Sequence, residues 1–389
     1  MQWVKTRSDM IVPLTVNLAL TRAAFDKDPD DPHVIQRLGE ALKKCSEYRE
    51  AAELFESALR RAPEAFSSWA LLAHCYSFLG RTDDALETCR RGEETGPTVD
   101  LYCERARALA RQHRHDESQA VLLAALEMDD SRPGMLALVL SPLAKGADGA
   151  RLLAICDELP AAYRYGSLAR AHRAIAFGRL GRTDEARQLM DVEGYVSIVP
   201  FEPPAEYGSL EKFNATLSAD ILTDLPAPSH IRDGVNIDYD QDLHRSEAFG
   251  VLRQFVAREV VAYLDRSAAT GLAEVMPPCP EVGSLGGAST VLSGTGRNGQ
   301  HVHPRGYVST VYYASIPSDL GDPSDLRGSL VLGPCDQYTR GYEACWDTRY
   351  VKPRAGWLVI FPSHIYHDVV PTQSQEVRIS VPADLVPRV

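Results

Sequence analysis

Residues 32–63 read PHVIQRLGEALKKCSEYREAAELFESALRRAP, and the spacing of their small, apolar and helix-ending residues returns 34 residues later. Gly39 and Pro63 of this stretch correspond to Ala73 and Pro97 of the next. Each copy has the apolar periodicity of helices and ends at a proline, which cannot continue a helix. The pattern therefore predicts a helical hairpin in each copy, with small residues where its two antiparallel helices approach closely.

The same pattern recurs further along the chain. One copy, a residue out of phase, runs through Ala106, Leu109, Ser118, Leu122 and Ala125, and a later one runs through Ala174, Phe177, Gly181 and Ala186. The matching segments LGRTDDAL and LGRTDEAR, at residues 79–86 and 180–187, strengthen the repeat. These units resemble tetratricopeptide repeats. Because one hairpin cannot bury its apolar face alone, they predict a stacked α-solenoid with a concave surface over residues 1–190.

Two uses of the expected solenoid remain open at this point. Its helices can serve only as a scaffold or as a dimerisation surface, or its concave face can form a groove for a peptide or protein segment. The sequence identifies no ligand for such a groove, and it leaves the oligomeric state undecided.

The overall composition excludes several classes of protein. The chain has 389 residues, of which 44% are hydrophobic and 24% charged, so it can fold around sizeable cores. Its net charge of -12 argues against nucleic-acid binding, which needs concentrated positive charge. No apolar run is long enough to span a membrane, and the start MQWVKTRSDMIVPL lacks the features of a secretion signal, so we expect a cytoplasmic protein. The eight cysteines form no CxxC pair, as expected of reduced thiols.

The helical-hairpin pattern of the sequence ends near residue 191. Two amphipathic helices are expected over residues 209–224 and 246–266. Short apolar runs separated by Gly, Pro, Asp and Ser predict strands at residues 288–294, 307–317, 328–334, 356–362 and 377–385. Such runs favour an antiparallel sandwich or barrel. The predicted architecture is an all-α solenoid over residues 1–190, followed by a mostly β domain over residues 191–389.

Three histidines and an arginine have a spacing that suggests a metal site. His301 and His303 lie in GQHVHPRGYVSTVYY, ahead of an alternating strand, where residues i and i+2 project from the same side. Two imidazoles on one face can share a metal ion. His367 follows 66 residues after His301, and Arg378 follows eleven residues after His367. Ser380 shares the strand face of Arg378.

This combination resembles the double-stranded β-helix of iron(II)- and 2-oxoglutarate-dependent oxygenases. HVHPRGYVSTVYYASIP, GSLVLGP, VKPRAGWLVIFPSHIYHDVVP and RISV are similar, more narrowly, to a bacterial branch of such oxygenases that is often fused to tetratricopeptide repeats. The likeness covers about residues 194–389 and is strongest over residues 299–387.

The resemblance implies a role for each matching residue. His301, His303 and His367 correspond to the ligands of Fe(II). Arg378 corresponds to the buried cation that holds the far carboxylate of 2-oxoglutarate, because a guanidinium offers that group a bidentate fork. Ser380 is expected to add a hydroxyl hydrogen bond, and Tyr313 or Tyr312 another. In the family, O2 is split, CO2 and succinate are released, and a C–H bond is usually hydroxylated.

One residue departs from the pattern of the family. Most such oxygenases have a carboxylate two residues after the first histidine, where this chain has His303. Three neutral imidazoles leave iron(II) at a charge of +2, so the anionic cosubstrate should balance more of the charge. Two alternatives stay open: His303 can point away, leaving two ligands and room for an exogenous anion, or the domain can lack a metal altogether.

Neighbouring candidates are expected to have lesser roles. His364 is expected in the pocket wall or behind the ligands, Asp368 at the surface or as a cap, and Arg305 as a solvated loop cation. The glycine-rich segment SLGGASTVLSGTG lacks the lysine of a phosphate loop, and the chain has neither a Gly-x-Ser-x-Gly elbow nor an HExxH helix.

The sequence thus predicts an oxygenase that hydroxylates a peptide or protein recruited by the repeats. A catalytically inactive adaptor is one alternative, because a fold does not guarantee an activity. An oxygenase acting on a small amino acid or a natural-product intermediate is the other.

Overall fold

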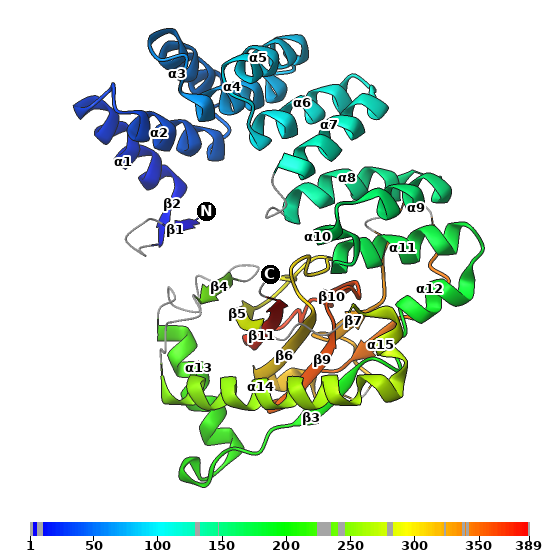
Figure 1. Ribbon diagram of the computed structural model, residues 1–389. Coiled ribbons are helices and arrows are strands. Elements are labelled where there is room, and N and C mark those ends of the chain that lie inside the picture. Colours follow the sequence, from blue (N-terminus) through cyan, green and yellow to red (C-terminus); the bar gives the residue numbers. More distant parts are fainter. Residues whose placement is uncertain are drawn as a thin grey trace. The chain divides into compact units, whose positions relative to one another are not determined.

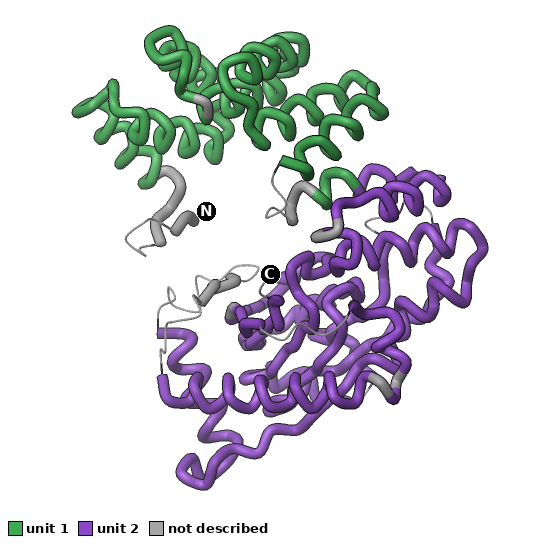
Figure 2. The backbone as a smooth tube through the Cα atoms, in the orientation of Figure 1, with its two compact units in different colours: residues 1–139 green, residues 140–389 purple. Residues whose placement is uncertain are grey.

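The computed structural model describes residues 3–5, 11–128, 133–146, 148–223, 235–239, 246–277, 283–322, 324–336, 339 and 342–387. The chain divides into two compact units, Met1–Val139 and Leu140–Val389 (Figure 2).

The first unit is almost entirely helical. Its described elements are a short antiparallel pair, β1 (Trp3–Lys5) and β2 (Ile11–Pro13), then α1 (Leu14–Lys27), α2 (Pro32–Lys44), α3 (Tyr48–Arg61), α4 (Phe66–Phe78), α5 (Thr82–Thr95), α6 (Val99–Arg111) and α7 (His115–Met128), with α8 (Pro133–Lys145) crossing the boundary (Figure 1). Helices α2 and α3, α4 and α5, and α6 and α7 form the hairpins that the repeat predicts. The expected helical repeat architecture is therefore confirmed.

Local chemistry explains how these hairpins form. The Asp31 side chain accepts a hydrogen bond from the His33 backbone N–H and caps α2, whose first residue is Pro32. Gly39 lies against the Phe55 ring, and a Cβ atom at residue 39 would come within 2.0 Å of that ring. The small residue therefore lets α2 and α3 approach closely.

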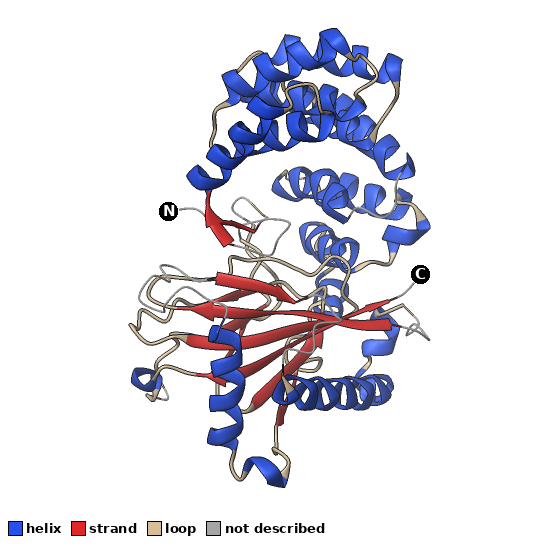
Figure 3. Cartoon of the chain, turned by 90° about the vertical axis from the view of Figure 1, so that its left-hand side faces the viewer, coloured by secondary structure: helices blue, strands red, loops and turns tan. Residues whose placement is uncertain are grey.

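The second unit contains two antiparallel sheets (Figure 3). Within the described residues, the larger sheet has six strands in the order β3 (Ser197–Pro200), β9 (Trp357–Pro362), β6 (Val308–Ser315), β11 (Arg378–Pro387), β5 (Gly283–Leu292) and β4 (Val235–Tyr239). The smaller sheet has the order β10 (His367–Val369), β7 (Leu330–Leu332) and β8 (Arg349–Val351). The predicted antiparallel β domain is confirmed.

Two helices, α13 (Leu210–Thr223) and α14 (Glu247–Arg266), cover one face of the larger sheet. The Tyr312 hydroxyl on β6 donates a hydrogen bond to Asn214 Oδ1 on α13 at 2.6 Å. Because side chains alternate along a strand, Ser309, Val311 and Tyr313 project from the opposite face of β6. That face is the interior of the two-sheet domain.

Four helices that follow residue 140 belong to the compact unit of the sheets: α9 (Gly149–Glu158), α10 (Ala161–Arg164), α11 (Ser167–Arg179) and α12 (Thr183–Leu189). Ser167 Oγ donates to the Gly306 carbonyl at 2.6 Å, and Arg187 Nε donates to the Cys345 carbonyl at 2.8 Å. The compact units therefore divide at residue 139, whereas the sequence places the end of the repeats at residue 190. That end of the repeat pattern stays a prediction.

Two further expectations concern membrane-spanning helices and cysteines. Over the part of the chain that is described, no helix combines the length and the apolar character needed to cross a membrane. The seven cysteines in this part are all free.

Candidate metal centre

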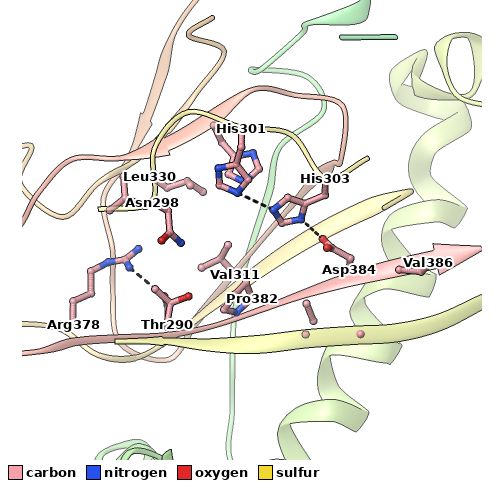
Figure 4. Close-up of a pocket in the computed structure, with 16 residues that line it drawn as sticks. Thr290, Asn298, His301, His303, Val311, Leu330, Arg378, Pro382, Asp384 and Val386 are labelled. Carbon is pink, nitrogen blue, oxygen red and sulfur yellow. Dashed lines mark hydrogen bonds and ion pairs between the residues drawn. The ribbon is translucent and has the colours of Figure 1, made fainter. Parts of the chain in front are cut away.

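Three histidines from two distant segments converge in the second unit. Figure 4 shows two of them, His301 and His303, turned toward each other. His301 and His367 lie opposite each other and exchange two backbone N–H···O hydrogen bonds of 3.0 Å, so their side chains project from the same side. His303 Nε2 lies 3.0 Å from His301 Nε2. One ligand atom from each ring lies within 4.8 Å of those of the other two. The structure brings together the three histidines that the sequence singled out.

The hydrogen bonds of the other ring nitrogens fix the tautomers. His301 Nδ1 lies 2.7 Å from the Gly299 carbonyl oxygen, and His367 Nδ1 lies 3.1 Å from the Ile365 carbonyl oxygen. His303 Nδ1 lies 2.5 Å from Asp384 Oδ1. Carbonyl and carboxylate oxygens only accept, so in the neutral form of each ring Nδ1 carries the proton and Nε2 keeps the lone pair that a metal would need.

The electrostatics of the cluster favour a bound cation. Burial, reinforced by the neighbouring imidazoles, lowers the pKa of His301 and holds the pKa of His367 well below its usual range. Both rings are therefore neutral near pH 7. Unprotonated Nε2 atoms 3.0 Å apart repel each other unless a cation or a proton lies between them. Three imidazole nitrogens suit a transition metal such as Fe, Zn, Cu or Ni.

A buried arginine shares the interior with this cluster. Arg378 is 1% exposed, and its NH1 atom donates to Ser380 Oγ at 3.1 Å. Within the described residues, Arg378 Nε has no hydrogen-bond partner and no acidic side chain pairs with Arg378, while the Tyr313 hydroxyl faces the guanidinium. Burial lowers the pKa of Arg378 and raises the pKa of Tyr313. A desolvated cation with an unsatisfied donor fits an anionic ligand.

One cavity of about 350 Å³ joins the two groups. One strand, β11, lines it with every second residue, Arg378, Ser380, Pro382, Asp384 and Val386, and also with Ala383. Facing strands and loops add Gly286, Gly287, Thr290, Asn298, Val311, Leu330 and Val369. The cavity therefore has a cationic end, a cluster of nitrogen ligands and largely apolar walls.

Most of the predicted site residues meet at this cavity. His301, His303, His367, Arg378 and Ser380 line it. The Tyr313 ring lies beside the guanidinium, 5.0 Å from Arg378 Cζ to the ring centroid. The other tyrosine considered, Tyr312, bonds instead to α13.

The lesser candidates lie elsewhere. His364 is fully buried, with Nε2 2.7 Å from the Leu189 carbonyl oxygen, and burial lowers its pKa to about 3. Its other ring nitrogen accepts from Arg170 Nε at 3.4 Å, and it does not line the cavity. Asp368 accepts a hydrogen bond from the Val369 N–H, and Arg305 is exposed in a turn.

Asp384 is the acidic cavity residue that sequence reasoning missed. It lies six residues after Arg378 on β11 and therefore on the same strand face. The alternation that placed Ser380 beside Arg378 would also have placed Asp384 in the cavity, had it been followed for four more residues.

Taken together, the fold and the cluster define a double-stranded β-helix domain with a candidate metal site, preceded by helical repeats. A family model described as "Putative 2OG-Fe(II) oxygenase" matches residues 289–384, and a tetratricopeptide repeat model matches residues 46–102. The first match includes all three histidines, Arg378 and Asp384. Both halves of the resemblance drawn from the sequence are confirmed.

Several solved structures are similar to parts of the chain. A prolyl-4-hydroxylase of Pseudomonas putida is 20% identical over 53% of this chain and 97% of its own, with a TM-score of 0.35. A thermophilic TPR protein of Thermus thermophilus is 19% identical over 46% of this chain and 80% of its own, with a TM-score of 0.30. YrrB, a TPR protein with an unusual peptide-binding site, is 13% identical over 44% of this chain and 93% of its own, with a TM-score of 0.33. No curated protein sequence matches the chain.

Proposed function

We propose that this chain is an iron(II)- and 2-oxoglutarate-dependent oxygenase. His301, His303 and His367 are the metal ligands of the proposal, and Arg378 binds the far carboxylate of 2-oxoglutarate. One observation carries it: three Nε2 lone pairs converge in the same cavity as a buried guanidinium without a counter-ion.

In this proposal, bound iron supplies the activation of O2 that oxidises a substrate C–H bond. The residues of the chain bind the metal and the cosubstrate and hold them in position. Arg378 grips a carboxylate with its planar fork, and the hydroxyls of Ser380 and Tyr313 lie beside the guanidinium to complete the anion site. Val311 and Leu330 in the cavity wall keep water from the reacting groups.

The substrate class is inferred from the helical repeats that precede the domain with the candidate metal site. Helical repeats of this kind commonly bind extended peptides along their concave face, which favours a peptide or protein substrate over a free metabolite. A small amino acid or natural-product intermediate is the alternative, since the cavity of about 350 Å³ accommodates a small molecule.

Succinate formation tests the activity. Purified full-length protein supplied with Fe(II), ascorbate, 2-oxoglutarate and O2 should release succinate slowly without substrate and faster with it. His367→Ala should abolish the release, because it removes a ligand from the cluster, whereas His33→Ala, at an exposed helix start, should not change it. Absence of both metal uptake and turnover with candidate substrates would contradict the proposal.

A catalytically inactive adaptor is the second candidate. The observation that favours it is His303 at the position where a carboxylate ligand is usual. Calorimetry separates the two: an adaptor binds a peptide with no heat of binding for either the metal or 2-oxoglutarate.

A further inference from the structure

We propose that Asp384 is the positioning residue of the metal site, and that its carboxylate supplies behind His303 the negative charge that no direct ligand supplies. This inference rests on the proposed function, because it concerns the same three histidines.

A short hydrogen-bond chain holds the carboxylate in place. Asp384 on β11 pairs with Ser309 on the neighbouring strand β6, and Ser309 Oγ donates to Asp384 Oδ1 at 2.7 Å. Ser309 Oγ lies 2.8 Å from Ser363 Oγ, which can donate to it. The same Oδ1 atom lies 2.5 Å from His303 Nδ1 (Figure 4). The carboxylate is thus fixed on one side and faces the imidazole on the other.

The contact determines how His303 presents itself to a metal. A carboxylate only accepts, so Nδ1 keeps its proton and Nε2 is the nitrogen that faces the cluster, 3.0 Å from His301 Nε2. Carboxylate–histidine–metal arrangements orient the ring and make its free nitrogen a better ligand. The Nδ1 atoms of His301 and His367 face backbone carbonyl oxygens instead. Among the described residues, His303 is therefore the one ring of the three whose Nδ1 faces a charged group.

The charge of the site follows from this arrangement. A divalent ion with three neutral imidazoles has a charge of +2, one unit more than with two imidazoles and one carboxylate. Asp384 supplies the missing negative charge indirectly, through its contact with the His303 ring. It does so without being a ligand itself, because it contacts Nδ1 while the cluster is formed by Nε2 atoms.

Cobalt(II) titration of the metal-free full-length protein tests this role. Asp384→Asn keeps the shape and one accepting oxygen but removes the charge, and should weaken cobalt binding about 10-fold. Asp384→Ala also removes the acceptor and should weaken it about 100-fold, with an altered cobalt absorption spectrum, in the range seen for outer-shell partners of metal-bound histidines. Asp368→Asn is the matched control, because Asp368 is next to His367 in sequence but faces the Val369 N–H and Arg297, and it should change the affinity less than twofold.

Each outcome of the cobalt titration supports or contradicts the role of Asp384. If both Asp384 variants bind cobalt within threefold of the unaltered protein, with the same spectrum, Asp384 has no positioning role and the proposed function still stands. If the unaltered folded protein takes up no cobalt, both proposals fail. Should the alanine variant not fold, the nearly isosteric asparagine variant decides alone, with its metal-free unfolding midpoint as the check on its fold.

Discussion

Replacing Arg378 with methionine should stabilise the ligand-free protein while removing its response to 2-oxoglutarate. The guanidinium is 1% exposed, and its NH1 atom donates to Ser380 Oγ at 3.1 Å. Because burial lowers the pKa of Arg378 and no carboxylate pairs with it, the charged group is desolvated without compensation. Replacing buried charges with apolar side chains of similar volume is often neutral or stabilising by about 1–4 kcal/mol.

The magnitude of the lost response can be worked out. At a concentration 100 times its Kd, 2-oxoglutarate should stabilise the unaltered protein by about 2.7 kcal/mol. Removing one partner of a buried, hydrogen-bonded charge pair weakens binding by about 2–5 kcal/mol. With a loss of about 2.7 kcal/mol, the same concentration only equals the new Kd, and the stabilisation falls to about 0.4 kcal/mol.

Urea unfolding with Zn(II), in the presence and absence of 2-oxoglutarate, measures both effects. Arg354→Met is the matched control, because that exposed guanidinium lies over the Trp357 ring at 4.8 Å and its loss should change stability by less than about 0.5 kcal/mol. The reasoning is refuted if the ligand-free Arg378→Met protein is less stable than the unaltered protein by more than about 0.5 kcal/mol, because the expected range is neutral to stabilising. A ligand response equal to that of the unaltered protein refutes it as well.

Three further predictions concern other parts of the molecule. Tyr313→Phe should weaken 2-oxoglutarate binding about 10-fold in calorimetry, because it removes a buried hydroxyl beside the guanidinium of Arg378 in the proposed anion site. Gly39→Ala should destabilise the repeats by about 1–3 kcal/mol in urea unfolding, because its Cβ would meet the Phe55 ring, whereas Gly250→Ala, with nothing within 4 Å, should be neutral or stabilising. Burial lowers the pKa of His172 to about 4, so the folded protein holds this ring neutral. Below about pH 6.5 the ring is protonated in the unfolded state first, and the free energy of unfolding should fall by about 1.4 kcal/mol per pH unit as the pH drops toward 4. Urea unfolding between pH 7 and pH 5 should show a flatter pH dependence for His172→Leu.

The helical and strand architecture was predictable because its causes are local in the sequence. Close approach of two helices requires a small residue at a fixed place in each repeat, and the contact of Gly39 with Phe55 is the physical reason. Short apolar runs between turn residues likewise indicated β6, β7, β9 and β11. The membership of α9–α12 in the second compact unit was not predictable, since a helical hairpin reads the same whether a sheet or another hairpin covers it.

The site was predictable where spacing along one strand or a family pattern determined it. His301, His303 and His367 followed from the pattern, and Ser380 followed from its alternation with Arg378. The partner of His303 depends on the register that places Asp384 opposite Ser309, which no single stretch of sequence displays. A contact between residues 81 positions apart becomes visible only after the strands are paired.

The charges of the loaded cavity explain why a third imidazole can replace the usual carboxylate ligand. Burying net charge in an interior is unfavourable, so the groups that meet there should sum to about zero. In the proposed complex, a divalent ion and Arg378 contribute three positive charges, and the two carboxylates of 2-oxoglutarate contribute two negative ones. Asp384 supplies the third negative charge through its contact with His303. Two imidazoles and a carboxylate ligand give the same sum, so His303 and Asp384 together are electrostatically equivalent to the ligand that His303 replaces.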